Sequence, residues 1–240
     1  MQKLITLVAV FTVSIVSAQW GQEKIKGNGT VASKEITTSD YESISVAGFF
    51  NVTLVEGKEG KISIKGEENL LEFIIVENEG SDLKIRTEKG YNLNPSKGNK
   101  IEITVPVQEI SKVSLAGSGG IVSNFTINVA NFEANLSGSG DIKLSVNSQN
   151  TEARLSGSGD IVLNGKTKSL ELAVSGSGDI EAFGLQSENS KATLSGSGNI
   201  STTCSELIEA RVAGSGDIEY KGNPKKVDTK VAGSGKIKMI

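Results

Sequence analysis

Histidine is absent from the 240-residue sequence, and cysteine and proline are scarce, with one and three copies. Without histidine, no Ser–His or Cys–His nucleophile can form, and the commonest side-chain ligand of protein-bound metals is missing. The single cysteine, Cys204, can form neither an internal disulfide nor a Cys/His zinc site within one chain. We therefore predict a protein that uses no metal or other cofactor and that is not an enzyme.

No excess of positive charge is present either. The chain has 25 Lys and Arg against 28 Asp and Glu, a formal net charge of −3, so it lacks the basic stripe expected of a nucleic-acid-binding protein. Its glycine-rich stretches complete neither the G-x-G-x-x-G nor the G-x-x-x-x-G-K-[ST] pattern that cradles phosphates. Neither a nucleic acid nor a nucleotide is a predicted partner.

The N-terminus has the pattern of a secretory signal peptide. Lys3 precedes an apolar run, Leu4 to Val16, and the small residues that end with Ala18 fit a cleavage site. The run is shorter than the roughly 20 residues needed to span a bilayer. We expect residues 1–18 to be a signal peptide and the polar residues 19–35 to be a flexible tether. The protein would then be exported to the periplasm, the outer membrane surface or the medium, and would not be cytoplasmic.

Seven copies of Gly-Ser-Gly organise the second half of the chain at spacings of 18 to 21 residues. Each copy has Leu or Val two residues before it and Ile four residues after its first glycine. Apolar residues alternate on both sides, as in strands with one buried face. The copies begin at Gly117, Gly138, Gly157, Gly176, Gly196, Gly214 and Gly233. A constant period of this kind indicates a repeat architecture.

A degenerate copy precedes the regular repeats. Residues 44–52 align with residues 113–121, which places Gly48-Phe49-Phe50 at the corner. We expect one domain over residues 36–240, with a less regular β portion at 36–112 and regular repeats at 113–240. Strand candidates in the less regular portion are Ser43–Val46, Asn51–Glu56, Lys61–Lys65, Glu72–Glu77, Asp82–Arg86 and Ile101–Val105, and Glu68–Phe73 could form a helical turn.

Two all-β architectures fit the repeat. In a parallel β-solenoid with coils of about 19 residues, equivalent residues of successive coils stack on one another. In a series of hairpins, Gly-Ser-Gly would be a three-residue loop, and Leu136 would face Ile142 across an antiparallel pair. We favour the solenoid, because hairpins do not require near-identity of every column or so constant a spacing.

The candidate ligand-binding residues are an aspartate column and one tyrosine. Asp141, Asp160, Asp179 and Asp217 follow their corners, with Asn199 at the same position. Such a column could bind a cation, but an Asx hydrogen bond within each corner explains it better and also accommodates Asn199. We predict no metal there. Tyr91, in the polar stretch 90–99, could contact a ligand or could pack the loop.

The segments YESISVAGFFNVTLVEG and ITVPVQEISKVSLAGSGGI, followed by the reiterated LSGSGDI, resemble the head GIN domain family of putative auto-transporter adhesins. The resemblance covers about residues 36–240 and implies a β-helical fold outside the inner membrane of a Gram-negative bacterium. It brings no catalytic motif.

The function that we expect is surface binding of the adhesin type, with a glycan or an envelope or host protein as the ligand. A purely structural envelope module is the alternative. A polysaccharide-active enzyme is a third interpretation, for which Glu133, Glu152 and Glu171 are the repeat-spaced acids, although a solvated charged face explains these better.

Overall fold

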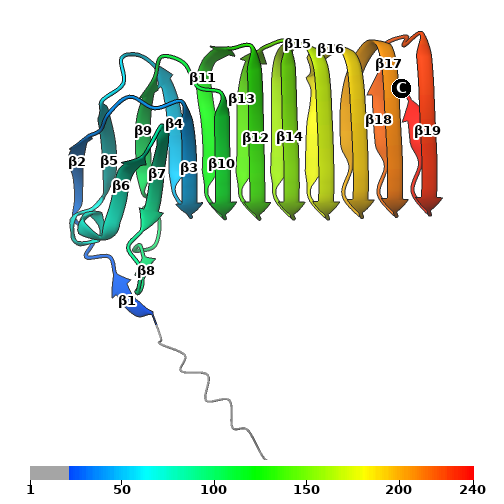
Figure 1. Ribbon diagram of the computed structural model, residues 1–240. Coiled ribbons are helices and arrows are strands. Elements are labelled where there is room, and N and C mark those ends of the chain that lie inside the picture. The colour runs from blue at the N-terminus through cyan, green and yellow to red at the C-terminus, as the bar shows by residue number, and fades with distance from the viewer. Residues whose placement is uncertain (1–21) are drawn as a thin grey trace, which may run out of the picture.

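The computed structural model describes residues 22–240. The expected signal peptide, residues 1–18, and the first three residues of the expected tether lie outside this range. The described chain consists almost entirely of strands, with one short 3-10 helix. The strands stack into a β-solenoid of about seven coils of about 19 residues each. Figure 1 shows the coils side by side along one axis, from the N-terminal strands to β19 at the opposite end.

The less regular portion contains nine strands and the helix: β1 (Glu23–Lys26), β2 (Val31–Thr37), β3 (Ser43–Gly48), β4 (Asn51–Glu56), β5 (Lys61–Glu67), η1 (Glu68–Phe73), β6 (Ile74–Glu79), β7 (Asp82–Thr87), β8 (Tyr91–Asn94) and β9 (Glu102–Val107). The repeats begin with β10 (Lys112–Gly117), β11 (Gly120–Asn128), β12 (Asn131–Gly138), β13 (Asp141–Asn147) and β14 (Asn150–Gly157). They continue as β15 (Asp160–Gly176), β16 (Asp179–Gly196), β17 (Ile200–Gly214), β18 (Ile218–Lys221), β19 (Lys226–Gly233) and β20 (Ile237–Met239).

Each coil pairs with its neighbours in parallel and in the register that the sequence repeat predicts. Leu136 pairs with Leu155 of the next coil, and Ile142 pairs with Ile161. The hairpin alternative is therefore wrong, since it required Leu136 and Ile142 to be partners in one antiparallel pair. The degenerate copy is also confirmed, because β10 pairs with β3 so that Gly117 lies on Gly48.

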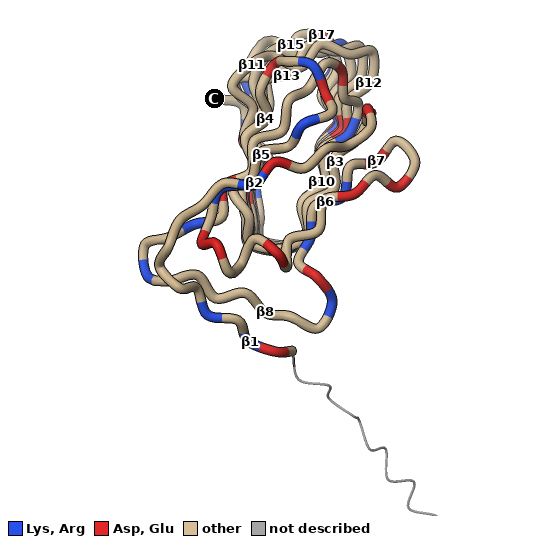
Figure 2. Tube along the Cα trace, turned by 90° about the vertical axis from the view of Figure 1, so that its left-hand side faces the viewer, with Lys and Arg blue, Asp and Glu red and all other residues tan. Residues whose placement is uncertain are grey.

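A complete coil has three paired segments. Between β15 and β16, residues 160–162 pair with 179–181, residues 164–167 with 184–187, and residues 169–176 with 189–196. The Gly-Ser-Gly corner separates the last segment of one coil from the first segment of the next. Viewed along the axis in Figure 2, the successive coils superpose around a common interior. Stacking at about 4.8 Å per coil thus places like side chains in columns.

The columns that point inward form the core. Two residues before their corners, Leu115, Leu136, Leu155 and Val174 are almost fully buried. The isoleucines that follow the first six corners are buried to the same degree. No single coil could cover this apolar surface, so each coil depends on its neighbours for stability.

Glycine at the corners is required by close stacking. Gly157 has a φ of 133°, and a Cβ built there would lie 2.2 Å from the carbonyl oxygen of Gly138 in the preceding coil. That oxygen accepts hydrogen bonds from the Ser158 N–H at 2.9 Å and from the Gly159 N–H at 3.1 Å. The corners therefore stack through their backbones, and a side chain at the first glycine would separate them.

Antiparallel strands cover the N-terminal end of the solenoid. β2 pairs with β5, β5 with β9, and β6 with β7, all antiparallel. Residues 68–73 form η1 as the helical turn predicted, and β6 begins only at Ile74, after this turn. Leu70 and Leu71 of η1 pack into the core and are 0% and 5% exposed. The interior is thus closed at this end.

The expectation of a flexible tether over residues 19–35 is wrong for most of that range. β1 pairs in parallel with β8, and β2 is an ordered edge strand on β5. The carboxylate of Glu67, which is 1% exposed, accepts hydrogen bonds from the N–H of Gly29 at 2.6 Å and from the N–H and hydroxyl of Ser96 at 2.7 and 2.6 Å. This buried carboxylate ties the N-terminal segment to the loop after β8. The polar pattern of these residues contains no sign of that tie.

Candidate binding surface

The strands that lead into the corners form one continuous outer face together with β7. In spatial order they are β7, β3, β10, β12 and β14, followed by the final segments of β15, β16 and β17 and then by β19. Alternate residues of these strands point into the core. The residues between them point outward and, because the register is constant, stack into rows along the solenoid axis.

Two adjacent rows line a groove on this face. The row next to the corners carries only Ala and Ser from β3 to β16: Ala47, Ala116, Ser137, Ser156, Ser175 and Ser195. The row two residues earlier carries Ser45, Ser114, Asn135, Arg154, Ala173 and Thr193. We call this the small-residue groove. It has a volume of about 760 Å³ and extends at its N-terminal end to Lys84 and Arg86 of β7.

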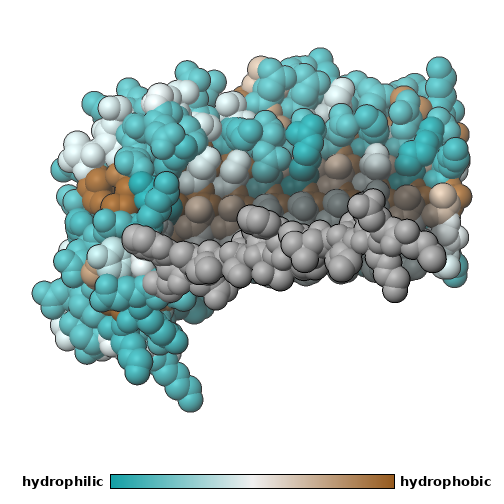
Figure 3. Space-filling view, turned by 60° about the horizontal axis from the view of Figure 1, so that its bottom comes forward, coloured by the Kyte–Doolittle hydropathy of each residue, from teal (hydrophilic) through white to brown (hydrophobic). Residues whose placement is uncertain are grey.

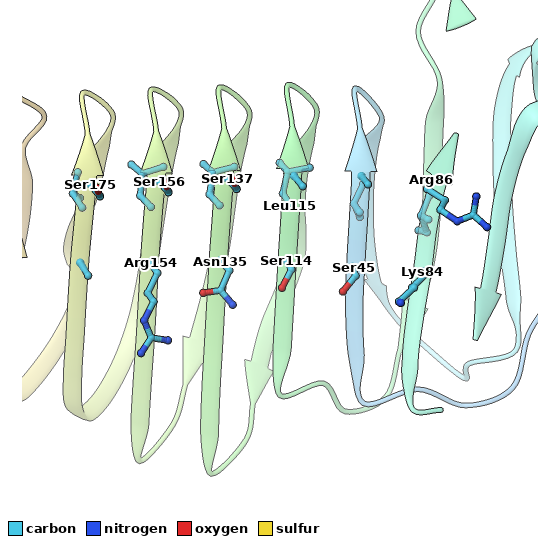
Figure 4. Close-up of a pocket in the computed structure, with 18 of the residues that line it drawn as sticks. Ser45, Lys84, Arg86, Ser114, Leu115, Asn135, Ser137, Arg154, Ser156 and Ser175 are labelled. Atoms are coloured by element: carbon cyan, nitrogen blue, oxygen red, sulfur yellow. The ribbon is translucent and has the colours of Figure 1, made fainter. Parts of the chain in front are cut away.

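The groove owes its depth to side-chain size. Figure 4 shows the serines of the first row lying just below the corners, with Ser45, Ser114 and Asn135 in the second row. Because these side chains are short, the aliphatic stems of the core residues between them help to line the groove. A hydrophobic band runs along the length of the molecule in Figure 3.

Longer charged side chains border the groove on the side away from the corners. Glu133 forms ion pairs with Lys112 at 3.2 Å and with Arg154 at 3.5 Å, and Arg154 also forms an ion pair with Glu152. A hydrogen bond from Asn135, together with Lys112 and Arg154, lowers the pKa of the Glu133 carboxyl group. This side of the groove is therefore a row of ionised, mutually paired groups.

The acids considered for glycosidase chemistry belong to this row. Glu133 and Glu152 are held by the cations just described, and Glu171 pairs with Lys191 at 2.8 Å. They are successive members of one ladder, with one acid per coil. A general acid would need a raised pKa, and the shift at Glu133 is in the opposite direction.

The aspartate column lies on a different side of each coil from the small-residue groove. Asp141, Asp160 and Asp179 are stacked in register on the strands that follow the corners, as the repeat predicted. Asp179, Asn199 and Asp217 line a shallow depression of about 390 Å³ there. The structure thus brings the predicted aspartates together with one another and not with the groove.

Their hydrogen bonds also differ from the Asx bonds that we expected. The Asp160 carboxylate accepts the N–H of Asp179 at 3.2 Å, and the Asp179 carboxylate accepts the N–H of Asn199 at 2.7 Å. In the same way, Asn199 accepts the N–H of Asp217, and Asp217 accepts the N–H of Lys236. Each side chain thus bonds to the next coil instead of closing its own corner. Asn199 can replace aspartate because an amide oxygen accepts this bond equally well.

Tyr91 is the other predicted contact. It lies on β8 and not in a loop, and its ring packs against Phe73 of η1 at a centroid distance of 4.4 Å. β8 pairs with β1 in a separate two-stranded sheet, and Tyr91 is not among the residues that line the small-residue groove. Its part in ligand binding stays a prediction.

Sequence reasoning missed the groove, although a signal for it was present. The residue just before the first glycine of every corner is Ala or Ser, from Ala47 to Ala232.

Within residues 22–240, no group of three or more Cys, Asp or Glu side chains is arranged to hold a metal ion. No helix of that described range is long and apolar enough to cross a membrane.

A family model described as "Putative auto-transporter adhesin, head GIN domain" matches residues 40–224, which is more than half of the chain. The chain belongs to this family. The resemblance inferred from the reiterated corner motif is thereby confirmed. No curated protein matches this GIN-domain chain.

Solved structures share its fold over nearly their whole length. A putative adhesin from Bacteroides fragilis NCTC 9343 is 25% identical, with a TM-score of 0.81, and the match covers 90% of this chain and 100% of that one. A putative lipid binding protein from Parabacteroides distasonis ATCC 8503 is 27% identical, with a TM-score of 0.76 and coverages of 91% and 100%. A putative adhesin from the same strain is 21% identical, with a TM-score of 0.73 and the same coverages, and shows a common fold.

Proposed function

We propose that this GIN-domain protein is an exported, non-enzymatic surface-binding protein that holds an extended ligand in the small-residue groove. The observation that carries the proposal is the groove itself, which follows the solenoid axis across the strands from β7 to β16. Its volume of about 760 Å³ lies within the range of ligand sites in proteins. The adhesin character of the family supports the same proposal, as do the signal-peptide pattern and the lack of histidine.

The chemistry of the groove favours a glycan over a protein as the ligand. Its outer row is Ala and Ser, which are depleted at protein–protein interfaces, and among residues 22–240 no aromatic side chain lines it as an anchor. The serine hydroxyls of successive coils both donate and accept hydrogen bonds and recur about every 4.8 Å. Such a row suits an extended polymer that carries many hydroxyl groups.

A lipid is the second candidate, because aliphatic side chains contribute much of the groove and a relative that is 27% identical is named a putative lipid binding protein. An acyl chain would lie against the aliphatic side chains that line the groove, with an anionic headgroup near Arg86 and Lys84. Both cations are already paired within the chain, with Glu77 and Glu79, which makes this site less favourable for an anion.

A glycan array on the purified chain tests the proposal, and the double variant Ser156→Lys/Ser175→Lys tests the site. Two lysines would fill the middle of the groove, and we expect them to reduce glycan binding at least tenfold. Both serines are exposed, so the melting temperature should stay within about 2 °C. The control is Ser201→Lys, which makes the same change on the strand after a corner, outside the groove.

If the double variant binds glycan as well as the wild type does, the groove is not the binding site. If no glycan binds and the protein instead sediments with lipid vesicles, the lipid candidate replaces the glycan. Binding to neither would favour the structural envelope module.

A further inference from the structure

The coil formed by β19 and β20 has no further coil stacked on it in the described structure. Val227 and Val231 continue inward columns of the core but are 53% and 42% exposed. Their register partners in the preceding coil, Ile208 and Val212, are 0% and 2% exposed. The high exposure therefore comes from the open position of β19 and not from any change of residue type.

The two ends of the solenoid are not alike. At the N-terminal end, η1 and the antiparallel strands β2 and β5 close the interior, and Leu70 is fully buried there. Figure 1 shows this N-terminal assembly on one side and the bare strand β19 on the other. The N-terminal end thus presents β2, an edge strand antiparallel to its neighbour β5, instead of an open coil. Only the C-terminal end of a second copy presents the same open coil.

The backbone of β19 is free for such a contact. The Asp228 carbonyl points back to β17, where it accepts a hydrogen bond from Arg211 Nη1 at 2.8 Å. Successive residues of a strand direct their N–H and C=O groups to opposite sides, so those of Val227, Thr229 and Val231 point to the open edge. Two such edges can pair only in an antiparallel way when the axes of the two solenoids oppose one another.

The sequence of β19 is self-complementary in one antiparallel register. With Thr229 opposite Thr229, Asp228 lies opposite the partner's Lys230, and Val227 lies opposite the partner's Val231. Because the arrangement has twofold symmetry, each of these pairs occurs twice. Opposite charges and apolar pairs directly across an antiparallel ladder are stabilising. We propose that β19 docks with β19 of a second copy in this register, which joins two solenoids end to end as a symmetric dimer.

The charges on β19 fit this pairing. Lysine on an edge strand ordinarily discourages association, but here Lys230 would be neutralised across the interface. Arg211 Nη2 holds Asp228 Oδ2 at 2.5 Å, and this fixes the carboxylate while leaving its other oxygen free to accept a second donor. The remaining charge of the strand, Lys226, would lie opposite the partner's Ala232.

Sedimentation velocity over a range of concentrations tests the proposal. We expect the purified chain to form a dimer reversibly in the micromolar range. Lys230→Asp should weaken the dimer by about tenfold or more, because Asp228 of each copy would then face an aspartate instead of a lysine. Asp228→Lys should weaken the dimer to a similar degree, because the new lysine of each copy would face Lys230 of the other copy. The matched control Lys226→Asp reverses the same charge on the same strand and should change the dissociation constant by less than threefold.

A one-to-one mixture of the two charge variants gives the sharpest result. Neither variant should associate with itself, but the mixture should form a heterodimer, since every Asp would then face a Lys. If Asp228→Lys does not fold once its pair with Arg211 is lost, the comparison of Lys230→Asp with Lys226→Asp decides. A wild type that stays monomeric at several hundred micromolar overturns the proposal. So does a dimer that Lys230→Asp and Lys226→Asp weaken equally.

Discussion

Replacing Gly157 by alanine tests the backbone stacking of the corners. The new Cβ would lie 2.2 Å from the Gly138 oxygen, whereas ordinary contacts of this kind are at least about 3.4 Å. The φ of 133° is also a conformation that essentially only glycine adopts. Alanine must therefore move the corner and separate two coils locally.

The expected cost has two parts. A non-glycine residue in this backbone region costs about 1–3 kcal/mol. Separation of the coils weakens the hydrogen bonds from the N–H groups of Ser158 and Gly159 to the Gly138 carbonyl, at about 1 kcal/mol each. The sum is about 3–5 kcal/mol. For a chain of this length, each kcal/mol lowers the melting temperature by about 2–4 °C, so we expect a decrease of roughly 6–20 °C.

Circular dichroism melting of the wild type and three variants measures this cost. Gly80→Ala is the matched control, since Gly80 has a φ of 64° but no atom within 4 Å of the position that a Cβ would take. It should cost about 1–2 kcal/mol through backbone strain alone. Ser158→Ala alters an exposed side chain of the same corner and should have almost no effect. If Gly157→Ala costs no more than Gly80→Ala, close stacking does not explain the constant spacing of glycine at the corners.

Two further predictions concern buried groups. Hydrogen bonds from Ser96, and then from Gly29, lower the pKa of the Glu67 carboxyl group, so its contribution to stability is full above the unfolded-state pKa of about 4.3 and is lost as the pH falls through the lower folded-state value. Glu67→Gln should lower the melting temperature at pH 7 and flatten its dependence on pH below about 4.3, and an unchanged profile would contradict this role. Burial raises the pKa of the Cys204 thiol to about 11, so at pH 8 the native protein should react with a thiol reagent far more slowly than the unfolded chain. Equal rates would show that the thiol is accessible.

The coil repeat could be predicted because it is local and periodic. Gly138, Gly157 and their equivalents recur at a fixed spacing, and Leu136 and Ile142 occupy the same places in every copy, so one coil specifies the next. In a solenoid, residues one period apart in the sequence are neighbours in space, and the columns follow directly from the alignment. The alignment of residues 44–52 with residues 113–121 succeeded for the same reason.

The candidate sites could be located only in part. The aspartate column was predicted as a column. Its carboxylates accept hydrogen bonds from the next coil, as Asp160 does from the Asp179 N–H, and this depends on how far successive coils are offset. The small-residue groove depends on side chains of five or more coils together, and no single copy of the repeat contains it.

The sequence by itself determined that the chain winds into stacked parallel coils with glycine corners and an aliphatic core, since alternation and period are properties of neighbouring residues. Only the tertiary structure decided the closure of the N-terminal end. β1 pairs with β8, and Glu67 binds the loops at Gly29 and Ser96, across long stretches of chain. β1 and β2 are largely exposed and show no apolar alternation, so the contacts that order them are absent from the local pattern.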